Sequence, residues 1–481
     1  MSDSTLEDLV VPSPELDPFE GIRRGYLVFF MLAAAAGLST LRPAPSDEEP
    51  EMPTVVEEST PAPAPRLTAS VKNEDGSARV YRPILVDHYR DPHGSMWHFY
   101  QALLDETQGK RKEPVRALYY GNSEIGFDRP TSQIRRRFQT HFGDGGKGFL
   151  VAAPGWRYQR HADVVWTQGG TWKIDTIRGA KRKDGLYGLG GVLAISDGPA
   201  WTEFATVPIA DSRPEGYLNF PAGTRFSKFE LYYQTYAGGG EIKVEADNGA
   251  QTMLLPAASY SPKDRVFSLD LGDGPHTVRV SGGRRPIRLY GAVLERERGF
   301  VLDTVQVIGA WANSQQVFNA DHLKRQVARR KPDLVIFQWG AKELMRNPIV
   351  SAAQARAFRK SYAESIRRTM AARPRASCLV ISTKDMGMRK RNLIVSRPAV
   401  KPIVRAASDA ADQTGCAFLN LYEALGGENT MRRWYEESPR RVAPDLGHLM
   451  RVGAIEVGDT VSDILIKAYD QYEKERREPA S

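Results

Sequence analysis

Three residues in this chain have the types and the sequence contexts that nucleophilic acyl chemistry requires. Ser123 stands in a Gly-Asn-Ser turn directly after an apolar run, and Asp445 and His448 lie three residues apart near the C-terminus. A serine hydroxyl becomes a strong nucleophile when an imidazole takes its proton and a carboxylate orients that imidazole. We therefore predict Ser123 as the nucleophile, His448 as the general base and Asp445 as the orienting group.

Acyl transfer also places negative charge on a carbonyl oxygen, and two glycines lie where they could help to stabilise it. Gly309 ends one apolar run, and the segment Gly-Ala-Lys-Glu, residues 340–343, ends the next. Because glycine has no side chain, its backbone N–H can come close to a developing oxyanion. Gly309 is therefore a predicted oxyanion donor. A glycine-rich loop, residues 142–149, is a further segment that stands out.

Each of these residues has a simpler explanation when it is taken alone. A serine after Gly-Asn is commonly a turn residue, and a histidine in a late loop is commonly a solvated surface group. Their joint order along the chain, each expected at the carboxyl edge of one sheet, favours the catalytic explanation. His88, His93 and His98 recur every five residues, which matches neither a helix face nor a strand face. We predict no metal site and no cofactor.

The apolar runs that precede these residues alternate with helical patterns. Five runs predict strands: residues 117–121, 303–309, 333–340, 377–383 and 417–422. Apolar residues at helical spacing predict helices over residues 321–330, 352–372, 398–414 and 452–472. Near-continuous apolar strands that alternate with helices indicate a parallel sheet covered on both faces, with ligands at the carboxyl ends of its strands. The predicted fold class is α/β.

Residues 167–298 interrupt this pattern. Short alternating runs between Gly, Asp and Asn turns predict antiparallel strands at residues 229–233, 242–246, 266–271, 277–280 and 287–290. Short strands at regular spacing are typical of a β-sandwich. Because the parallel pattern begins before this segment and resumes after it, we predict a sandwich inserted into an α/β domain made of residues 67–166 and 299–481.

The ordered blocks Gly-x-Ser, Gly, Gly-x-x-Glu and Asp-x-x-His resemble those of the SGNH/GDSL hydrolase superfamily of serine esterases. The resemblance covers about residues 80–166 and 299–472, and it is strongest in the segments 118–123, 142–149, 332–337, 415–427 and 445–448. It implies a flavodoxin-like three-layer α/β/α sandwich with a five-stranded parallel sheet. It also implies a triad of Ser123, Asp445 and His448. The insertion is similar to the carbohydrate-binding-like module of the peptidoglycan O-acetylesterase subgroup.

Two positions depart from the family blocks. Asn122 stands where the family has Asp, and asparagine can form the same kind of turn. Lys342 stands where the family has the Asn that donates to the oxyanion. Losing such an amide costs about 10²–10³ in rate, and a flexible ammonium is a less preorganised donor. The resemblance implies an oxyanion hole made of the Ser123 and Gly309 backbone N–H groups and a third donor, whose position Lys342 occupies. Esterase activity would accordingly be retained, attenuated or lost.

Three functions fit these residues. The predicted one is a serine esterase that removes O-acetyl groups from an envelope polysaccharide such as peptidoglycan. The alternatives are an attenuated pseudoenzyme that binds an anionic glycan, and a glycan O-acetyltransferase in which a sugar replaces water as the acyl acceptor. The ordered blocks, the insertion and the predicted export favour the esterase.

The charge distribution indicates an anionic partner. The 481-residue chain has a net charge of +8, to which residues 1–66 contribute −8, so residues 67–481 carry +16. A strongly basic body favours an anionic polymer or surface. No nucleic-acid motif accompanies the short basic runs 329–331 and 389–391. The predicted partner is therefore an acylated anionic envelope glycan, and the oligomeric state stays open.

The N-terminal region predicts where the protein acts. Residues 25–41 contain no charge over 17 residues, which is near the minimum for a transmembrane helix, and Arg23 and Arg24 precede them. The positive-inside bias then places residues 1–24 in the cytoplasm, one span in the inner membrane, and the rest of the chain in the periplasm or outside the cell. A cleaved signal peptide is the alternative. Residues 42–66, rich in Pro and Glu, predict an extended linker.

The chain has two cysteines, Cys378 and Cys416, and both lie in apolar runs that predict strands. Two cysteines exclude a disulfide framework and a Cys-rich zinc module. Their setting predicts two buried thiols, although an exported location would permit a bridge.

Overall fold

The structure is a computed structural model of the chain. It describes residues 69–72, 78–81, 84–156, 159–179, 182–206, 225–346 and 351–477. The predicted cytoplasmic tail, transmembrane segment and linker, residues 1–66, lie outside the described residues. Of the helices in the described ranges, none combines the length and the apolar character that crossing a bilayer requires.

A mostly parallel sheet forms the centre of the α/β part. Its five parallel strands are β5 (Val115–Gly121), β15 (Phe300–Gln306), β16 (Leu334–Gln338), β17 (Ser377–Ile381) and β20 (Ala417–Leu419). They lie in the spatial order β15-β5-β16-β17-β20. By their order along the chain this is the flavodoxin-like arrangement, so the predicted parallel sheet is confirmed.

The sheet is wider than predicted. Two antiparallel strands, β4 (Tyr89–Arg90) and β3 (Leu85–Val86), extend it beyond β20 to seven strands. A two-residue strand is too short to show a period of two, so the sequence gives no signal for either of them.

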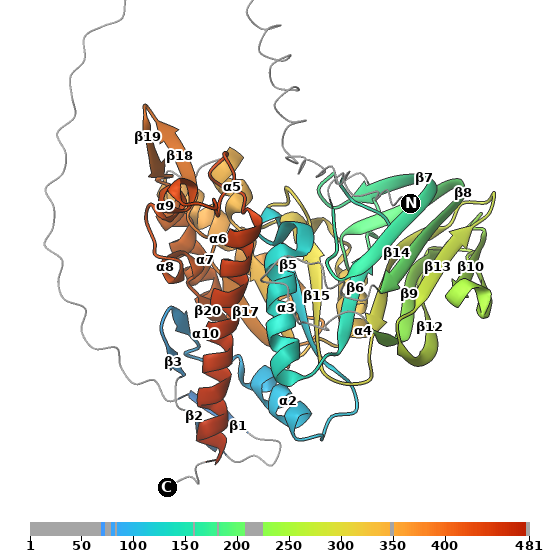
Figure 1. Ribbon diagram of the computed structural model, residues 1–481, viewed down its shortest axis with the longest axis horizontal. Helices are drawn as coiled ribbons and strands as arrows, with labels where there is room; N and C mark the ends of the chain where they lie inside the picture. The colour runs from blue at the N-terminus through green and yellow to red at the C-terminus, as the bar shows by residue number, and fades with distance from the viewer. Residues whose placement is uncertain are drawn as a thin grey trace, which may run out of the picture. The chain divides into compact units, whose positions relative to one another are not determined.

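Helices cover both faces of this sheet. On one face lie α2 (Trp97–Thr107), α3 (Arg129–Phe142) and α10 (Arg451–Arg477), and on the other lie α4 (Ala320–Arg330), α6 (Ala352–Met370) and α7 (Val400–Thr414). Figure 1 shows α3 and α10 side by side. The side chains of β5 divide between the two cores, because Ala117 and Tyr119 pack with the first set of helices and Leu118 and Tyr120 with the second. The three-layer α/β/α arrangement is thus confirmed.

Local sequence signals set the starts of two of the main helices. Ser351 and Gln354 form a capping box at the start of α6, and Asn319 accepts a hydrogen bond from the His322 N–H at the start of α4. The smaller elements are α5 (Ala341–Arg346), α8 (Leu421–Ala424), α9 (Thr430–Glu436), the 3₁₀ helices η1 (Ser123–Asp128), η2 (Asp247–Gly249) and η3 (Ser314–Val317), and the hairpin strands β1 (Ala69–Lys72), β2 (Ala78–Tyr81), β18 (Gly387–Lys390) and β19 (Leu393–Ser396).

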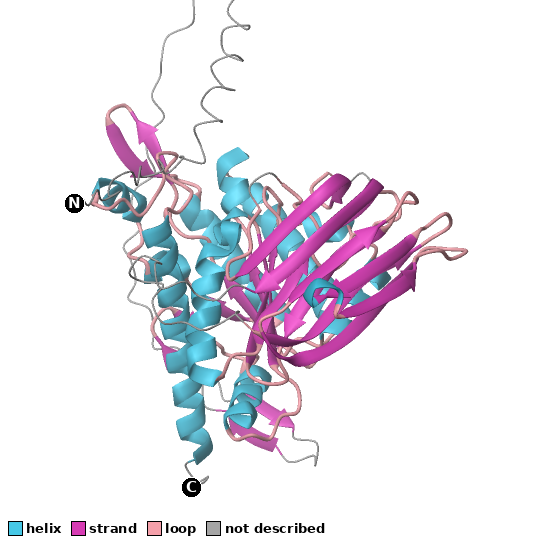
Figure 2. Cartoon of the chain, turned by 45° about the vertical axis from the view of Figure 1, so that its right-hand side comes forward, coloured by secondary structure: helices cyan, strands magenta, loops and turns pink. Residues whose placement is uncertain are grey.

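The inserted segment forms one hydrogen-bonded antiparallel sheet of nine strands. They are β6 (Gly146–Val151), β7 (Val164–Thr176), β8 (Val192–Thr206), β9 (Phe226–Thr235), β10 (Glu241–Ala246), β11 (Gln251–Pro256), β12 (Lys263–Gly274), β13 (Thr277–Gly282) and β14 (Arg288–Glu295). Their long arrows dominate one side of Figure 2. The sheet begins earlier than the predicted boundary at residue 167, because β6 pairs with β14.

Both faces of this sheet are buried where it meets the α/β part. On β9, Phe229 and Leu231 face a core that belongs to the antiparallel sheet and also contains Val244 of β10. Tyr232, the residue after Leu231, packs instead into the core that α4, α6 and α7 share. The sheet therefore folds over its own core and also shares a second core with the α/β part. This second contact fixes the turns of the insertion relative to the parallel sheet.

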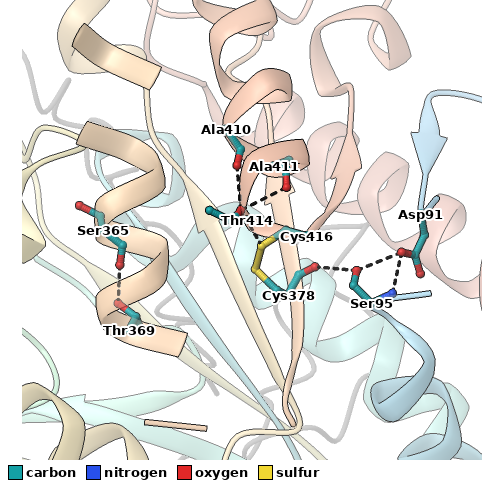
Figure 3. The surroundings of a disulfide bond; sticks show 9 residues. All are labelled: Asp91, Ser95, Ser365, Thr369, Cys378, Ala410, Ala411, Thr414 and Cys416. Atoms are coloured by element: carbon teal, nitrogen blue, oxygen red, sulfur yellow. Dashed lines mark hydrogen bonds between the residues drawn. A yellow bond between two sulfur atoms is a disulfide. The ribbon is translucent and has the colours of Figure 1, made fainter. Parts of the chain in front are cut away.

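The two cysteines form a disulfide bond, so the prediction of two free thiols is wrong. Cys378 on β17 and Cys416, just before β20, have Cα atoms 4.7 Å apart. The parallel register pairs Leu379 with Ala417, which brings the preceding cysteines opposite each other. Figure 3 shows the bond with the Thr414 hydroxyl beside the Cys416 sulfur. Strand register, which composition does not reveal, decides this pairing.

Candidate active site

Ser123 lies directly after β5, at the first position of η1. The preceding Asn122 side chain is buried, and its Oδ1 accepts a hydrogen bond from the Glu124 N–H at 3.2 Å. This is the Asx-type turn expected for asparagine at this position. The Nδ2 of Asn122 donates a hydrogen bond to the Ala310 carbonyl at 3.4 Å, which connects the turn to the loop after β15. Ser123 itself stays partly exposed.

Asp445 and His448 are hydrogen-bonded to each other. His448 Nδ1 lies 2.5 Å from Asp445 Oδ2, and Asp445 Oδ1 accepts from the backbone N–H groups of Gly447 and His448, each at 3.0 Å. Burial alone would raise the pKa of Asp445, but these hydrogen bonds and the His448 ring hold it well below its ordinary value. The carboxylate therefore stays ionised and favours a proton on Nδ1, which leaves Nε2 as the basic nitrogen.

Lys384 links the loop of His448 to the turn of Ser123. Its Nζ donates to the Gly447 carbonyl at 2.6 Å and forms an ion pair with Glu124 Oε2 at 3.3 Å. The other oxygen of Glu124 accepts from the Thr383 hydroxyl at 2.6 Å. One buried lysine thus binds the residue after Ser123 and the residue before His448. The sequence did not single out Lys384, although it follows the apolar run of β17 just as Ser123 follows β5.

The hydroxyl of Ser123 makes no hydrogen bond to the His448 ring within the described residues. The Ser123 hydroxyl and the His448 ring lie at the same edge of the sheet but are not hydrogen-bonded to each other. In proteins without a bound substrate, catalytic hydrogen bonds are often long and shorten only when substrate binds.

Gly309 and Lys342 follow the two strands that flank β5. Gly309, after β15, has a φ of +74°, a left-handed conformation that favours glycine. Lys342, after β16, is partly buried in the first turn of α5, and its Nζ lies 5.6 Å from the centre of the Trp311 ring. Both residues therefore lie at the carboxyl edge where Ser123 also lies. The ammonium of Lys342 lies over the loop that contains Gly309.

The Glu343 side chain holds the loop that contains Gly309. Its Oε1 accepts a hydrogen bond from the Ala312 N–H at 2.8 Å, and the Ser365 hydroxyl donates to the Ala312 carbonyl at 2.5 Å. Burial raises the pKa of Glu343 above its ordinary value. The loop between Gly309 and Ala312 is thus fixed by a buried carboxyl group.

The far end of η1 rests on a buried ionic cluster. Asp128 Oδ2 accepts from Lys147 Nζ at 2.6 Å, and Arg135 bridges Asp128 to Asp163, which also pairs with Arg136. Burial lowers the pKa of Lys147 to about 8. Lys147 belongs to the glycine-rich loop 142–149, which the sequence singled out without a role. In the structure this loop anchors the turn that carries Ser123.

Arg178 is a further charged residue at this edge that the sequence did not indicate. It follows β7 of the antiparallel sheet, and its Nε lies 3.1 Å from the position that a Cβ atom would take on Gly309. Within the described ranges, no group of three or more His, Cys, Asp and Glu side chains could hold a metal ion. The residues gathered here are those of acyl transfer: a hydroxyl, an imidazole with its carboxylate, and donors beside a glycine turn.

Comparison with known proteins finds a solved structure that shares this fold. No family model matches the chain, and no curated protein is similar in sequence. A peptidoglycan O-acetylesterase superposes with a TM-score of 0.61 at 21% identity, covering 78% of this chain and 96% of that one. The predicted resemblance to the fold of a peptidoglycan O-acetylesterase is thereby confirmed.

Two further structures match less well. A carbohydrate esterase family 2 enzyme with a carbohydrate binding domain, from Corynascus thermopiles (Myceliophthora fergusii), has a TM-score of 0.28 at 11% identity and covers 57% of this chain and 95% of that one. A salicylyl-acyltransferase from a tetracycline biosynthetic pathway has a TM-score of 0.28 at 12% identity and covers 64% and 95%. At these TM-scores neither carries weight.

Proposed function

We propose that this protein is a serine esterase that removes O-acetyl groups from an envelope polysaccharide such as peptidoglycan. The observation that carries the proposal is the hydrogen-bonded Asp445–His448 pair, tied through Lys384 to the turn that begins at Ser123. The fold shared with a peptidoglycan O-acetylesterase supports a glycan as substrate.

In the proposed reaction, Ser123 Oγ attacks the acetyl carbonyl while His448 Nε2 accepts the hydroxyl proton. The backbone N–H groups of Ser123 and Gly309, together with Lys342, stabilise the oxyanion. The bond between the carbonyl carbon and the sugar oxygen then breaks, and His448 returns the proton to the sugar. Water attacks the acetyl-serine, again with His448 as base, and releases acetate and free Ser123.

We place this reaction outside the cytoplasm. The uncharged segment 25–41 behind two arginines supports a membrane anchor with the α/β part exported. The disulfide between Cys378 and Cys416 supports the same location, because such bonds persist in oxidising compartments. The net charge of +16 on residues 67–481 supports an anionic glycan as partner.

A pure glycan-binding role is the second candidate, because Lys342 replaces the family amide and its ammonium lies over Trp311. Acetate release from O-acetylated peptidoglycan and from an aryl acetate separates the candidates. We expect Ser123→Ala to lower both rates by at least about 10³-fold. Equal rates for wild type and Ser123→Ala would overturn the esterase. Acetyl groups that appear on added sugar instead of free acetate would identify a transferase.

A further inference from the structure

The antiparallel sheet contributes a cation to the edge that carries Ser123. Arg178 lies in the turn after β7, and its Nε and Cζ atoms are 3.1 and 3.3 Å from the position of a Cβ on Gly309. The guanidinium therefore packs against the backbone of the proposed oxyanion glycine. A Cβ atom at residue 309 would force the guanidinium to shift by a few tenths of an ångström, so glycine permits this close contact.

The backbone beneath Arg178 is fixed. The N–H of Ile177 donates to the Gly191 carbonyl at 3.0 Å, and the Ile177 side chain is buried in the core shared by the two sheets. The N–H of Gly179 closes the turn on the Thr176 carbonyl at 3.0 Å. The side chain thus starts from a fixed point, and its approach to Gly309 is a property of the fold.

Arg178 differs from the nearest arginine along the chain. Arg182 pairs with Asp184 and lies 3.5 Å from Asp175. Arg178 is exposed, and no carboxylate in the described ranges pairs with it. A guanidinium that no protein carboxylate neutralises can accept an anion from a ligand.

We propose that Arg178 binds a carboxylate of the polysaccharide and so selects acidic sugars at the ester-cleaving site. The planar guanidinium matches a carboxylate through two parallel N–H···O bonds. Because Arg178 packs on Gly309, a sugar held by it would present its ester close to Ser123. This inference rests on the proposed function, and it assigns the antiparallel sheet a direct part in substrate selection.

The test compares one substrate in two charge states: a peptide-free O-acetylated peptidoglycan oligosaccharide with free carboxylates, and the same oligosaccharide with those carboxylates converted to methylamides. We expect Arg178→Ala to lower kcat/KM for the charged form about ten- to a hundredfold relative to the methylamide form, mainly through KM. Arg178→Lys, which keeps the charge but not the planar geometry, should give an intermediate ratio. Lys173→Ala, at an exposed position of β7 just before the turn of Arg178, is the control and should leave the ratio unchanged.

Binding gives a readout that does not depend on turnover. In a Ser123→Ala background, Arg178→Ala should weaken the Kd for the charged oligosaccharide by the same factor and leave the methylamide Kd within about twofold. An unchanged charge preference in both assays would overturn the inference. An equal loss on both substrates would also overturn it, since Arg178 would then act on a step common to all esters. Absence of Ser123-dependent acetate release would instead overturn the proposed function, and the binding assay would still decide the role of Arg178.

Discussion

At the residue scale, the partner of His448 decides which of its nitrogens can act as base. Asp445 accepts from Nδ1 and from two backbone N–H groups, and these contacts hold its pKa well below the ordinary value. An asparagine could present its amide to Nδ1 and favour the tautomer with the proton on Nε2. We expect Asp445→Asn to lower kcat for an aryl acetate about 10³–10⁴-fold with little change in thermal stability. A loss below about tenfold would show that Asp445 does not orient the base.

At Lys342 we predict a substitution that raises kcat instead of lowering it. Its ammonium lies 5.6 Å from the centre of the Trp311 ring, an attraction that competes with donation to an oxyanion. A held amide is the better preorganised donor, so we expect Lys342→Asn to raise kcat about tenfold. Lys342→Ala, which removes both kinds of donor, is the control and should lower kcat. If both substitutions lower kcat equally, the ammonium itself is the working donor.

The residues of the site were not equally predictable from the sequence. Ser123 and His448 were singled out because they belong to an ordered set of blocks, and Ser123 also follows an apolar run. Lys384 follows such a run as well, but its contacts with Glu124 and Gly447 depend on tertiary structure. Arg178 lies in a turn of the insertion, and no local pattern indicates that this turn reaches Gly309.

At the scale of elements, Lys384 joins the end of β17 to the turns before α3 and before α10. It is buried between Glu124 and the Gly447 carbonyl. Lys384→Met would leave Glu124 as a buried charge without its cation, so we expect a loss of about 3–5 kcal/mol in the free energy of unfolding. We also expect lower esterase activity, because the loop of His448 loses its tie. Urea unfolding at pH 7 measures the first effect and acetate release the second.

Two companions make the Lys384 test specific. Lys390→Met, at the exposed end of β18, removes a lysine of the same length and should change neither stability nor activity. Adding Glu124→Gln to Lys384→Met removes the uncompensated charge and should restore part of the stability without restoring activity. A double variant as unstable as Lys384→Met would contradict the ion-pair explanation.

Element prediction succeeded where a run was long and failed where it was short or irregular. The five parallel strands and the helices between them have clear apolar periods. β6 was missed because its Gly-Lys-Gly start looks like a loop, yet it pairs with β14 through residues 146–151. The disulfide was missed because its cysteines are 38 residues apart and meet only through strand register.

At the scale of the whole described fold, the antiparallel sheet and the α/β part share a core and a buried ion network. Glu295, at the end of β14, binds Arg116 of β5 at 2.9 Å and Arg330 of α4 at 2.5 Å, and Arg330 also binds Asp303 of β15 at 2.8 Å. Charged groups this deeply buried are costly unless all of them are paired. The two parts should therefore unfold together, in one transition.

The pH dependence of Glu295 tests this coupling. Burial opposes its ionisation, but Arg330 and Arg116 outweigh burial and lower its pKa from 4.5 to about 2. A carboxyl group with a lowered pKa stabilises the fold above its unfolded-state pKa, and that stabilisation disappears as the pH falls toward the folded value.

We expect Glu295→Gln to lose about 1.5–3 kcal/mol of unfolding free energy at pH 7, and the difference from wild type to shrink below about pH 4.5. Urea unfolding at pH 7, 4 and 3, followed by circular dichroism and by tryptophan fluorescence, measures both. A stability difference between wild type and Glu295→Gln that stays constant down to pH 3 would contradict an ion network that joins the two sheets. So would unfolding transitions that differ between circular dichroism and fluorescence.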